Sequence, residues 1–312
     1  MNLRAGLVVP RGTAISVVDR IVTAENRGVP TVWSTAGGIS ADTLSAFAVA
    51  ASRTERIVLG TAIVPTYPRH PFVMASEALA IEQFAPGRFR LGVGPSHRPT
   101  IEDSFGISMG KPLAHLREYV AILRALLWEG SVEFEGEYFA VNGALPAGST
   151  PPKTPLPIST LRPNAYRLAG EISDGAISWL NPIDYIVGVA MPALTESAER
   201  AGRARPPVIA HVPVAISTNR GAARAAFRER FPVYGRLPFY AEMFALAGYP
   251  VEGDGRMPDG LVDDLLVSGT VDQVRARLET IRGRGIDELL ISHVPVENED
   301  CELEALSAIL AG

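Results

Sequence analysis

The sequence predicts an α/β protein and, within that class, a (β/α)8 barrel, also called a TIM barrel. Three observations favour this fold. Short apolar runs rich in β-branched residues occur eight times, segments of helical length separate them, and the chain of 312 residues is long enough for such a barrel with insertions. A doubly wound parallel sheet fits the same alternation and is the alternative. We expect a single domain over residues 1–312.

The eight predicted strands recur from the N-terminus to the end of the chain. Proline, glycine or charged residues bound most of the runs. Runs that are apolar at nearly every position are typical of parallel strands covered by helices. The runs are RAGLVV (4–9), TVWST (31–35), RIVLGTAIV (56–64), RFRLGVG (88–94), LPIST (156–160), GAISWL (175–180), VIAHVPVAIS (208–217) and ELLISHV (288–294).

The predicted helices show their pattern most clearly in three places. Within residues 112–128, apolar side chains from Leu116 to Leu127 recur three and four positions apart, which is the period of an amphipathic helix. A helix over residues 71–84 begins with a proline, which suits a first helical position. Another begins after Thr270, whose hydroxyl can cap it.

Two further segments, residues 130–155 and 236–260, are predicted to be insertions. The first is rich in proline, glycine and aromatic residues. We expect both to be loop insertions at the C-terminal face of the barrel, where they would shape a substrate pocket.

Composition excludes several classes of function. The net charge is -5 and no basic run is present, which argues against a surface for nucleic acid. The first apolar segment ends at Pro10 and Arg11, so it is too short for a signal peptide or a membrane span. Cys301 is the only cysteine, so no intrachain disulfide is possible. We expect a cytoplasmic protein without nucleic-acid or membrane partners.

The residues near strand ends limit the chemistry, because the active groups of barrel enzymes lie at the C-terminal ends of strands. The five histidines are scattered and the first strand ends without a metal ligand, so no metal site is predicted. The only lysines, Lys111 and Lys153, lie in loop or helix-edge positions that do not suit a Schiff base.

The segment GVGPSHR (92–98) resembles two common motifs and fits neither. A dinucleotide-binding G-x-G-x-x-G loop requires a third glycine, where His97 stands, and a helix directly behind it. A G-x-S-x-G nucleophile turn requires a final glycine, where Arg98 stands. We interpret the segment as the C-terminal end of the fourth strand, where an active-site residue of a barrel would lie.

Four segments carry a family resemblance by their order and spacing. They are LGTAIVPTYPRHPFVMASEALAIEQFAPGRFRLGVGPSHRP (59–99), HLREYVAILRALLWEGSVEFEGEYFAV (115–141), RLAGEISDGAI (167–177) and VSGTVDQVRARLETIRGRGIDELLI (267–291). Together they resemble the bacterial luciferase-like oxidoreductase superfamily and are most similar to its deazaflavin-dependent branch.

The resemblance implies a barrel enzyme that binds the deazaflavin coenzyme F420, or alternatively FMN, at the C-terminal ends of its strands. The implied activity is hydride transfer between F420 and a small organic acceptor. An FMN-dependent monooxygenase that uses reduced flavin and oxygen is one alternative. A barrel that binds a flavin or deazaflavin without turnover is another. We expect a small-molecule substrate and a homodimer.

The resemblance also assigns cofactor contacts. Family members often carry a non-proline cis peptide after the third strand, behind the cofactor ring, and the matching bond here joins Ala62 and Ile63. The family holds the cofactor phosphate where the fifth strand turns into its helix, and the matching residues are Thr160, Leu161 and Arg162. The cofactor is also expected to contact Gly92, Gly94 and Ser96, where glycines let the backbone approach closely.

His97 is the predicted catalytic residue, because an imidazole can donate a proton near neutral pH. Its alternative role is a contact that only lines the site. Many deazaflavin dehydrogenases of the family carry an aspartate-histidine pair after the second strand. This chain has WSTAGG (33–38) there, which makes alcohol oxidation a poorer match.

Trp33 and Trp179 lie near strand ends and are predicted to wall the substrate pocket, with core packing as the alternative. Arg69, Arg98 and Arg162 are the basic residues expected to attract an anionic cofactor.

Overall fold

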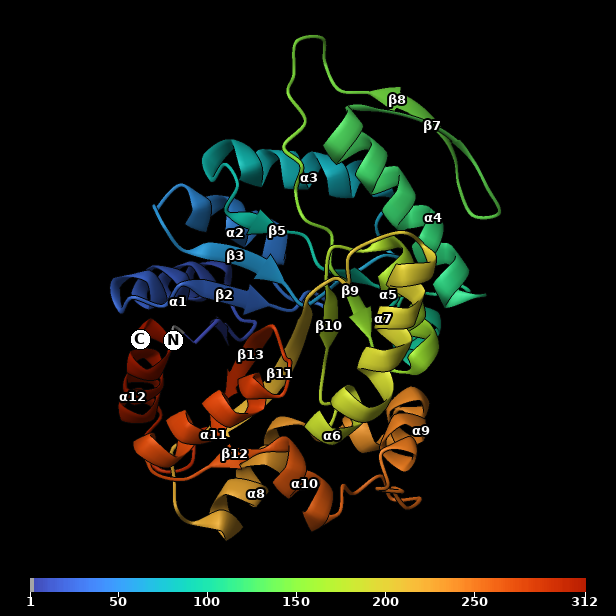
Figure 1. Ribbon diagram of the computed structural model, residues 1–312. Coiled ribbons are helices and arrows are strands. Elements are labelled where there is room, and N and C mark those ends of the chain that lie inside the picture. The colour runs from blue at the N-terminus through green and yellow to red at the C-terminus, as the bar shows by residue number, and fades with distance from the viewer. Residues whose placement is uncertain (1–2) are drawn as a thin grey trace.

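The computed structural model describes residues 3–312, and a parallel β-barrel surrounded by helices forms its centre (Figure 1). The barrel strands are β1 (Ala5–Val8), β2 (Thr31–Ser34), β3 (Val58–Thr61), β4 (Val64–Pro65), β5 (Phe89–Arg90), β6 (Val93–Gly94), β9 (Ile158–Thr160), β10 (Ala176–Ser178), β11 (Val208–Ala215) and β13 (Glu288–His293). A short strand, β12 (Val267–Ser268), pairs with β11.

The strands close on themselves. Neighbours follow the order β4-β6-β9-β10-β11-β13-β1-β2-β3-β5. β3 and β4 are two halves of one strand, separated by Ala62 and Ile63, and β5 and β6 are two halves of the next, separated by Leu91 and Gly92. Because β3 pairs in parallel with β5 and β4 with β6, the two ends of the sheet meet. Every barrel strand lies within one of the eight predicted runs, except that β4 extends one residue beyond its run, to Pro65. The predicted (β/α)8 barrel is confirmed.

The helices lie outside the strands (Figure 1). They are α1 (Ala14–Asn26), α2 (Thr43–Ala51), α3 (Pro71–Phe84), α4 (Pro112–Arg124), α5 (Pro163–Ile172), α6 (Ile183–Tyr185), α7 (Met191–Arg200), α8 (Arg220–Arg230), α9 (Pro238–Leu246), α10 (Asp259–Leu265), α11 (Val271–Gly283) and α12 (Glu299–Ala311). The three helices whose pattern was clearest are present. α4 continues as a π-helical turn, Ala125–Glu129, and Thr270 and Gln273 form a reciprocal capping box at the start of α11.

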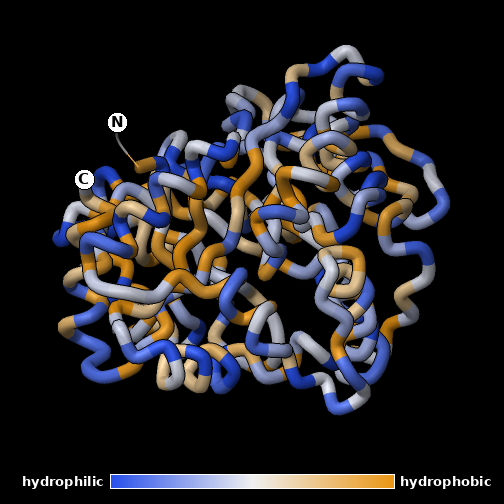
Figure 2. Tube along the Cα trace, turned by 60° about the horizontal axis from the view of Figure 1, so that its bottom comes forward, coloured by the Kyte–Doolittle hydropathy of each residue, from blue (hydrophilic) through white to orange (hydrophobic). Residues whose placement is uncertain are grey.

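The core has two parts. The larger part fills the space between strands and helices, for example where Phe47 of α2 meets Phe89 of β5 edge to face at 6.4 Å. The smaller part fills the barrel interior and consists of Val8, Trp33, Ala62, Ile177, Ile209 and Leu290. Figure 2 shows hydrophobic residues concentrated along interior segments and hydrophilic ones along outer loops. Within residues 3–312, no helix combines the length and apolar character that crossing a membrane requires.

The first predicted insertion contains an antiparallel hairpin, β7 (Ser131–Glu135) and β8 (Ala140–Ala144). It follows a helix and precedes β9, so it leaves from the N-terminal end of the barrel strands and not from the C-terminal face that we expected. The carboxylate of Glu118 in α4 accepts hydrogen bonds from the backbone N–H groups of Glu137 and Tyr138 at 2.8 and 2.9 Å. These bonds hold the hairpin tip against the outer helical layer (Figure 1).

The second predicted insertion follows β11 and α8, and it contains α9. Tyr240 of α9 lies 5.7 Å from the ring of His97, which follows the C-terminal end of β6. This part of the insertion therefore covers the C-terminal face, as expected.

Candidate active site

The end of β6 turns sharply toward the barrel mouth. Ser96 has φ of 64°, a left-handed conformation that residues other than glycine rarely adopt. The turn places the ring of His97 against two tyrosines, at 6.4 Å from the ring of Tyr234 and 5.7 Å from that of Tyr240. His97 is half-buried, and burial lowers its pKa, so its imidazole is neutral at pH 7.

The glycines before this turn are required by strand packing. A Cβ on Gly92 would overlap the carbonyl oxygen of Thr61, and a Cβ on Gly94 would overlap the hydroxyl of Ser159. Ile63 is the next neighbour of that Cβ on Gly94, at 3.2 Å. The packing of neighbouring strands therefore accounts for both glycines without a cofactor, and their contact with one stays a prediction.

The interruption of the third strand contains the expected cis peptide. The bond between Ala62 and Ile63 is cis, as the family resemblance implied. Ala62 donates its N–H to Ser34 at 2.8 Å, and the carbonyl of Ile63 accepts from Ala36 at 3.0 Å, so the bulge is tied to the end of β2. Ile63 is half-buried and packs against the interior cluster of the barrel.

The turn from β9 into α5 is where the cofactor phosphate is expected, and no side chain of the described residues caps the helix there. Thr160 is buried, and its hydroxyl donates to Ile177 at 3.1 Å. The carbonyl of Leu161 accepts from the Asn181 amide at 3.0 Å.

α5 begins at Pro163, which has no N–H. Ala165 donates its N–H to the carbonyl of Arg162 at 2.9 Å. The N–H of Asn164 and the helix dipole therefore form the position suited to an anion.

The arginines nominated for an anionic cofactor already have carboxylate partners. Arg162 pairs with Glu242 of α9, and its guanidinium lies 4.7 Å from the ring of Phe239. Arg69 contacts Asp42 at 2.7 Å and Glu77 at 3.2 Å, and Arg98 pairs with Glu102. A cofactor phosphate at Arg162 would therefore have to share or replace the carboxylate of Glu242.

Trp33 does not face a pocket. It is completely buried, and its indole N–H donates to Glu288, the first residue of β13, at 3.2 Å. Gly6 and Gly60 on the neighbouring strands make room for the ring, because a Cβ on Gly6 would lie 2.7 Å from it. The ring therefore extends toward the N-terminal end of the barrel and packs in the interior, which corrects the expectation of a pocket wall.

Trp179 lies where a pocket residue is expected. Its half-buried ring stacks on the buried ring of His211, with centroids 3.7 Å apart and planes at 4°. The Nε2 atom of His211 is 2.7 Å from the hydroxyl of Ser292 on β13. Phe231 packs its edge against His211 at 5.7 Å. Trp179 thus stays a candidate wall of the site.

Aromatic residues within and just before the second insertion complete this region. We call Phe231, Tyr234 and Tyr240 the aromatic cover. Tyr234 lies 5.9 Å from Phe231 and 4.8 Å from Tyr240. The cover connects His211 with His97 across the barrel mouth. It was not predicted because these rings follow no helical or strand period in the sequence.

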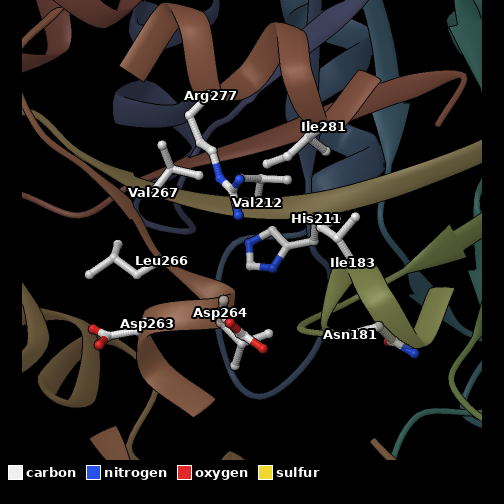
Figure 3. A pocket seen from close by; sticks show the side chains of 11 residues that line it. Asn181, Ile183, His211, Val212, Asp263, Asp264, Leu266, Val267, Arg277 and Ile281 are labelled. Atoms are coloured by element: carbon white, nitrogen blue, oxygen red, sulfur yellow. The ribbon is translucent and has the colours of Figure 1, made fainter. Parts of the chain in front are cut away.

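A small cavity lies beside β11, between α10 and α11. Its volume is about 10 Å³, which is about the space of one water. Figure 3 shows His211 at the centre of its lining, with Asp263 and Asp264 on one side and Arg277 on the other. A cavity of this size does not hold an organic substrate.

Comparison with known proteins identifies the family. The profile of the luciferase-like monooxygenase family matches residues 4–288. The chain belongs to this family. A 5,10-methylenetetrahydromethanopterin reductase of Archaeoglobus fulgidus is 29% identical over 289 residues, which cover 86% of each chain.

Solved structures show the same fold. An F420-dependent secondary alcohol dehydrogenase in complex with an F420–acetone adduct has a TM-score of 0.83 at 17% identity, covering 99% of this chain and 98% of the other. The coenzyme F420 dependent tetrahydromethanopterin reductase from Methanopyrus kandleri has a TM-score of 0.79 at 21% identity, covering 98% of each chain.

Proposed function

We propose that this luciferase-like protein is an oxidoreductase that transfers a hydride between coenzyme F420 and a small organic acceptor. The observation that carries the choice of cofactor is the similarity to a putative coenzyme F420-dependent oxidoreductase of Mycobacterium tuberculosis, which is 29% identical over 316 residues and matches 88% of this chain. Two solved structures of F420-dependent enzymes share the fold. A small-molecule substrate and a homodimer are part of the proposal.

The residues at the strand ends fit a phosphate-bearing cofactor. The uncapped N-terminus of α5 offers the N–H of Asn164 and the helix dipole to a phosphate. Arg162 stands beside it, with its guanidinium held by Glu242 and Phe239. Ile63 and Trp179 both pack on the interior cluster of the barrel and are both only half-buried. Ile63 would support the cofactor ring, and Trp179 would face the acceptor.

In the proposed reaction, the protein's own groups orient the reactants and donate the proton. When bound, F420 supplies or accepts the hydride. A ring nitrogen of His97 would give a proton to the reduced acceptor, and the aromatic cover would keep water out of the mouth. Because the imidazole of His97 is neutral at pH 7, proton transfer from it becomes easier as pH falls.

Cofactor titration tests the proposal. The purified protein would be titrated with F420 and, separately, with FMN, following cofactor fluorescence. We expect saturable binding of F420 that is at least about tenfold tighter than that of FMN. If FMN binds more tightly and the reduced flavin consumes oxygen, the protein is an FMN-dependent monooxygenase and the F420 proposal is wrong. Tight F420 binding without turnover of any acceptor would leave only a binding protein.

A further inference from the structure

A cleft on the outside of the helical layer is separate from the candidate active site. It has a volume of about 550 Å³ and lies between α4, α5 and strand β7. This volume falls within the usual range of small-molecule sites, about 300–1,000 Å³. None of the residues that line it belongs to the strand ends described above.

The middle of the cleft is apolar. It is lined by the side chains of Val120 and Ala121 on α4, Phe134 on β7 and Ile172 at the end of α5. Val120 is buried, Phe134 and Ile172 are half-buried, and Ala121 is exposed. An apolar body placed here would remove the remaining apolar surface from water.

Positive charge stands at both ends of this apolar floor, on one face of α4. Arg117 and Arg124 are seven residues apart, about 10 Å along a helix, with Ala121 between them. Arg117 pairs with Glu171 of α5, so its charge is matched. The end at Arg124 is different.

At the Arg124 end, two guanidinium groups share one carboxylate. Asp174 lies 2.8 Å from Arg124 and 3.7 Å from Arg203, and it also accepts the N–H of Leu156 at 2.9 Å. Burial and the charge of Arg124 lower the pKa of Arg203. One positive charge is therefore left unmatched at this end of the cleft.

Arg124 has nitrogens available for a ligand. Its hydrogen bonds within residues 3–312, to the carbonyl of Ile172 and to Asp174, both leave from Nη2. The guanidinium also lies 4.7 Å from the ring of Trp128, which fixes its plane. Nε and Nη1 are thus free to donate to an anion.

We propose that this cleft binds an amphipathic monoanion, whose aromatic or aliphatic body lies on Phe134 and Ile172 and whose carboxylate or sulfonate lies on Arg124. The anionic group is placed at the Arg124 end because two guanidinium groups share one carboxylate there. Glu118 also lines the cleft, but its carboxylate accepts N–H groups of the hairpin tip. The site does not depend on the proposed F420 chemistry.

A pair of fluorescent probes tests the proposal. Anilinonaphthalene sulfonate has an aromatic body and one anionic group, and its analogue without the sulfonate is uncharged. Ala121 is exposed in mid-helix, so it can be replaced without disturbing the core. We expect Ala121→Glu to bind the sulfonate probe at least about fivefold more weakly than the isosteric Ala121→Gln, with no such difference for the uncharged analogue.

A third variant locates the site. Ala121→Trp should fill the cleft and remove binding of both probes, while circular dichroism and F420 affinity stay at wild-type values. Unchanged binding of the sulfonate probe in Ala121→Trp and Ala121→Glu would overturn the proposal. A change from dimer to monomer in Ala121→Trp, measured by sedimentation, would also overturn it, because the cleft would then be a contact between copies of the chain.

Discussion

Glu242 of α9 forms an ion pair with Arg162, the residue that precedes the first turn of α5. The pair joins the insertion above the barrel mouth to the end of the fifth barrel strand, and Phe239 holds the same guanidinium from its ring face at 4.7 Å. A carboxylate therefore stands where the proposed function puts a cofactor phosphate.

Replacement of Glu242 should strengthen cofactor binding. In Glu242→Gln the guanidinium of Arg162 no longer has a competing carboxylate, so we expect F420 to bind about threefold to fivefold more tightly at low salt, the size expected of an exposed ion pair. The gain should shrink at high salt because the ions screen it. Fluorescence titration at both salt concentrations measures it.

The matched control is Glu252→Gln, which removes an exposed charge from the same insertion away from Arg162. Equal gains in both variants would show a general effect of charge.

In Arg162→Ala, F420 should bind more weakly, and the loss should be larger at low salt. Unchanged affinity at both salt concentrations would place the phosphate elsewhere.

His97→Gln should separate cofactor binding from turnover. Glutamine keeps a hydrogen-bonding amide of similar reach but carries no titrating proton. We expect F420 affinity within about threefold of wild type and turnover lower by roughly 10²-fold, the usual size of general acid catalysis. Stopped-flow oxidation of the reduced cofactor by a working acceptor measures the second value. Full activity would reduce His97 to a residue that lines the site.

The same residue predicts a pH profile. A general acid must be protonated, and burial lowers the pKa of His97 below its ordinary value of 6.5. Turnover of the wild type should therefore rise as pH falls below about 6.5, while that of His97→Gln should stay flat over the same range. A wild-type rate that falls in this range would point to a general base instead.

The alternation of strands and helices was predictable because each element carries its own local pattern. The eight apolar runs and the helix over residues 71–84 needed no information from distant parts of the chain. The position of the hairpin β7–β8 was also available in the sequence, since a segment that follows a helix and precedes a barrel strand must leave from the N-terminal face.

The site was less predictable because its contacts join distant segments. Arg162 and Glu242 are eighty positions apart, and His211 and Ser292 are eighty-one apart. The two tryptophans looked alike in sequence, since both stand near strand ends. Trp33 packs in the core because glycines on both adjoining strands leave space for its ring, a cross-strand register that composition does not reveal.

The buried ring of His115 should make stability depend on pH. It stacks on Tyr67 at 4.0 Å, and burial lowers its pKa to about 4 from the ordinary 6.5. The unfolded chain therefore binds more protons between about pH 4 and 6.5, so folding stability is complete above that range and falls as pH decreases through it.

His115→Phe keeps an aromatic ring against Tyr67 and removes the titrating group. Between about pH 7 and pH 5, we expect wild type to lose about 1 kcal/mol more of its unfolding free energy than the variant, after allowance for solvent screening. Urea unfolding at the two pH values measures both. Equal losses would show that His115 is readily protonated in the folded protein.

Replacement of Gly92 or Gly94 by alanine should lower stability, but a second substitution should restore stability only at position 94. On Gly92 an added Cβ meets the backbone carbonyl of Thr61, which cannot move without disturbing the pairing of β3 with β2, where Thr61 lies opposite Ser34. On Gly94 it meets the side chain of Ser159 instead. Gly92→Ala should therefore cost at least about 3 kcal/mol or prevent folding, whereas Gly94→Ala should cost about 1–3 kcal/mol.

Ser159→Gly removes the obstacle above Gly94 and should restore most of the stability lost in Gly94→Ala. The double variant then shows a favourable coupling energy of about 1 kcal/mol or more in a double-mutant cycle measured by urea unfolding. The same Ser159→Gly change should give no rescue of Gly92→Ala, which makes it the matched control. Additive losses for Gly94→Ala and Ser159→Gly would show that Ser159 is not what makes an added Cβ at position 94 costly.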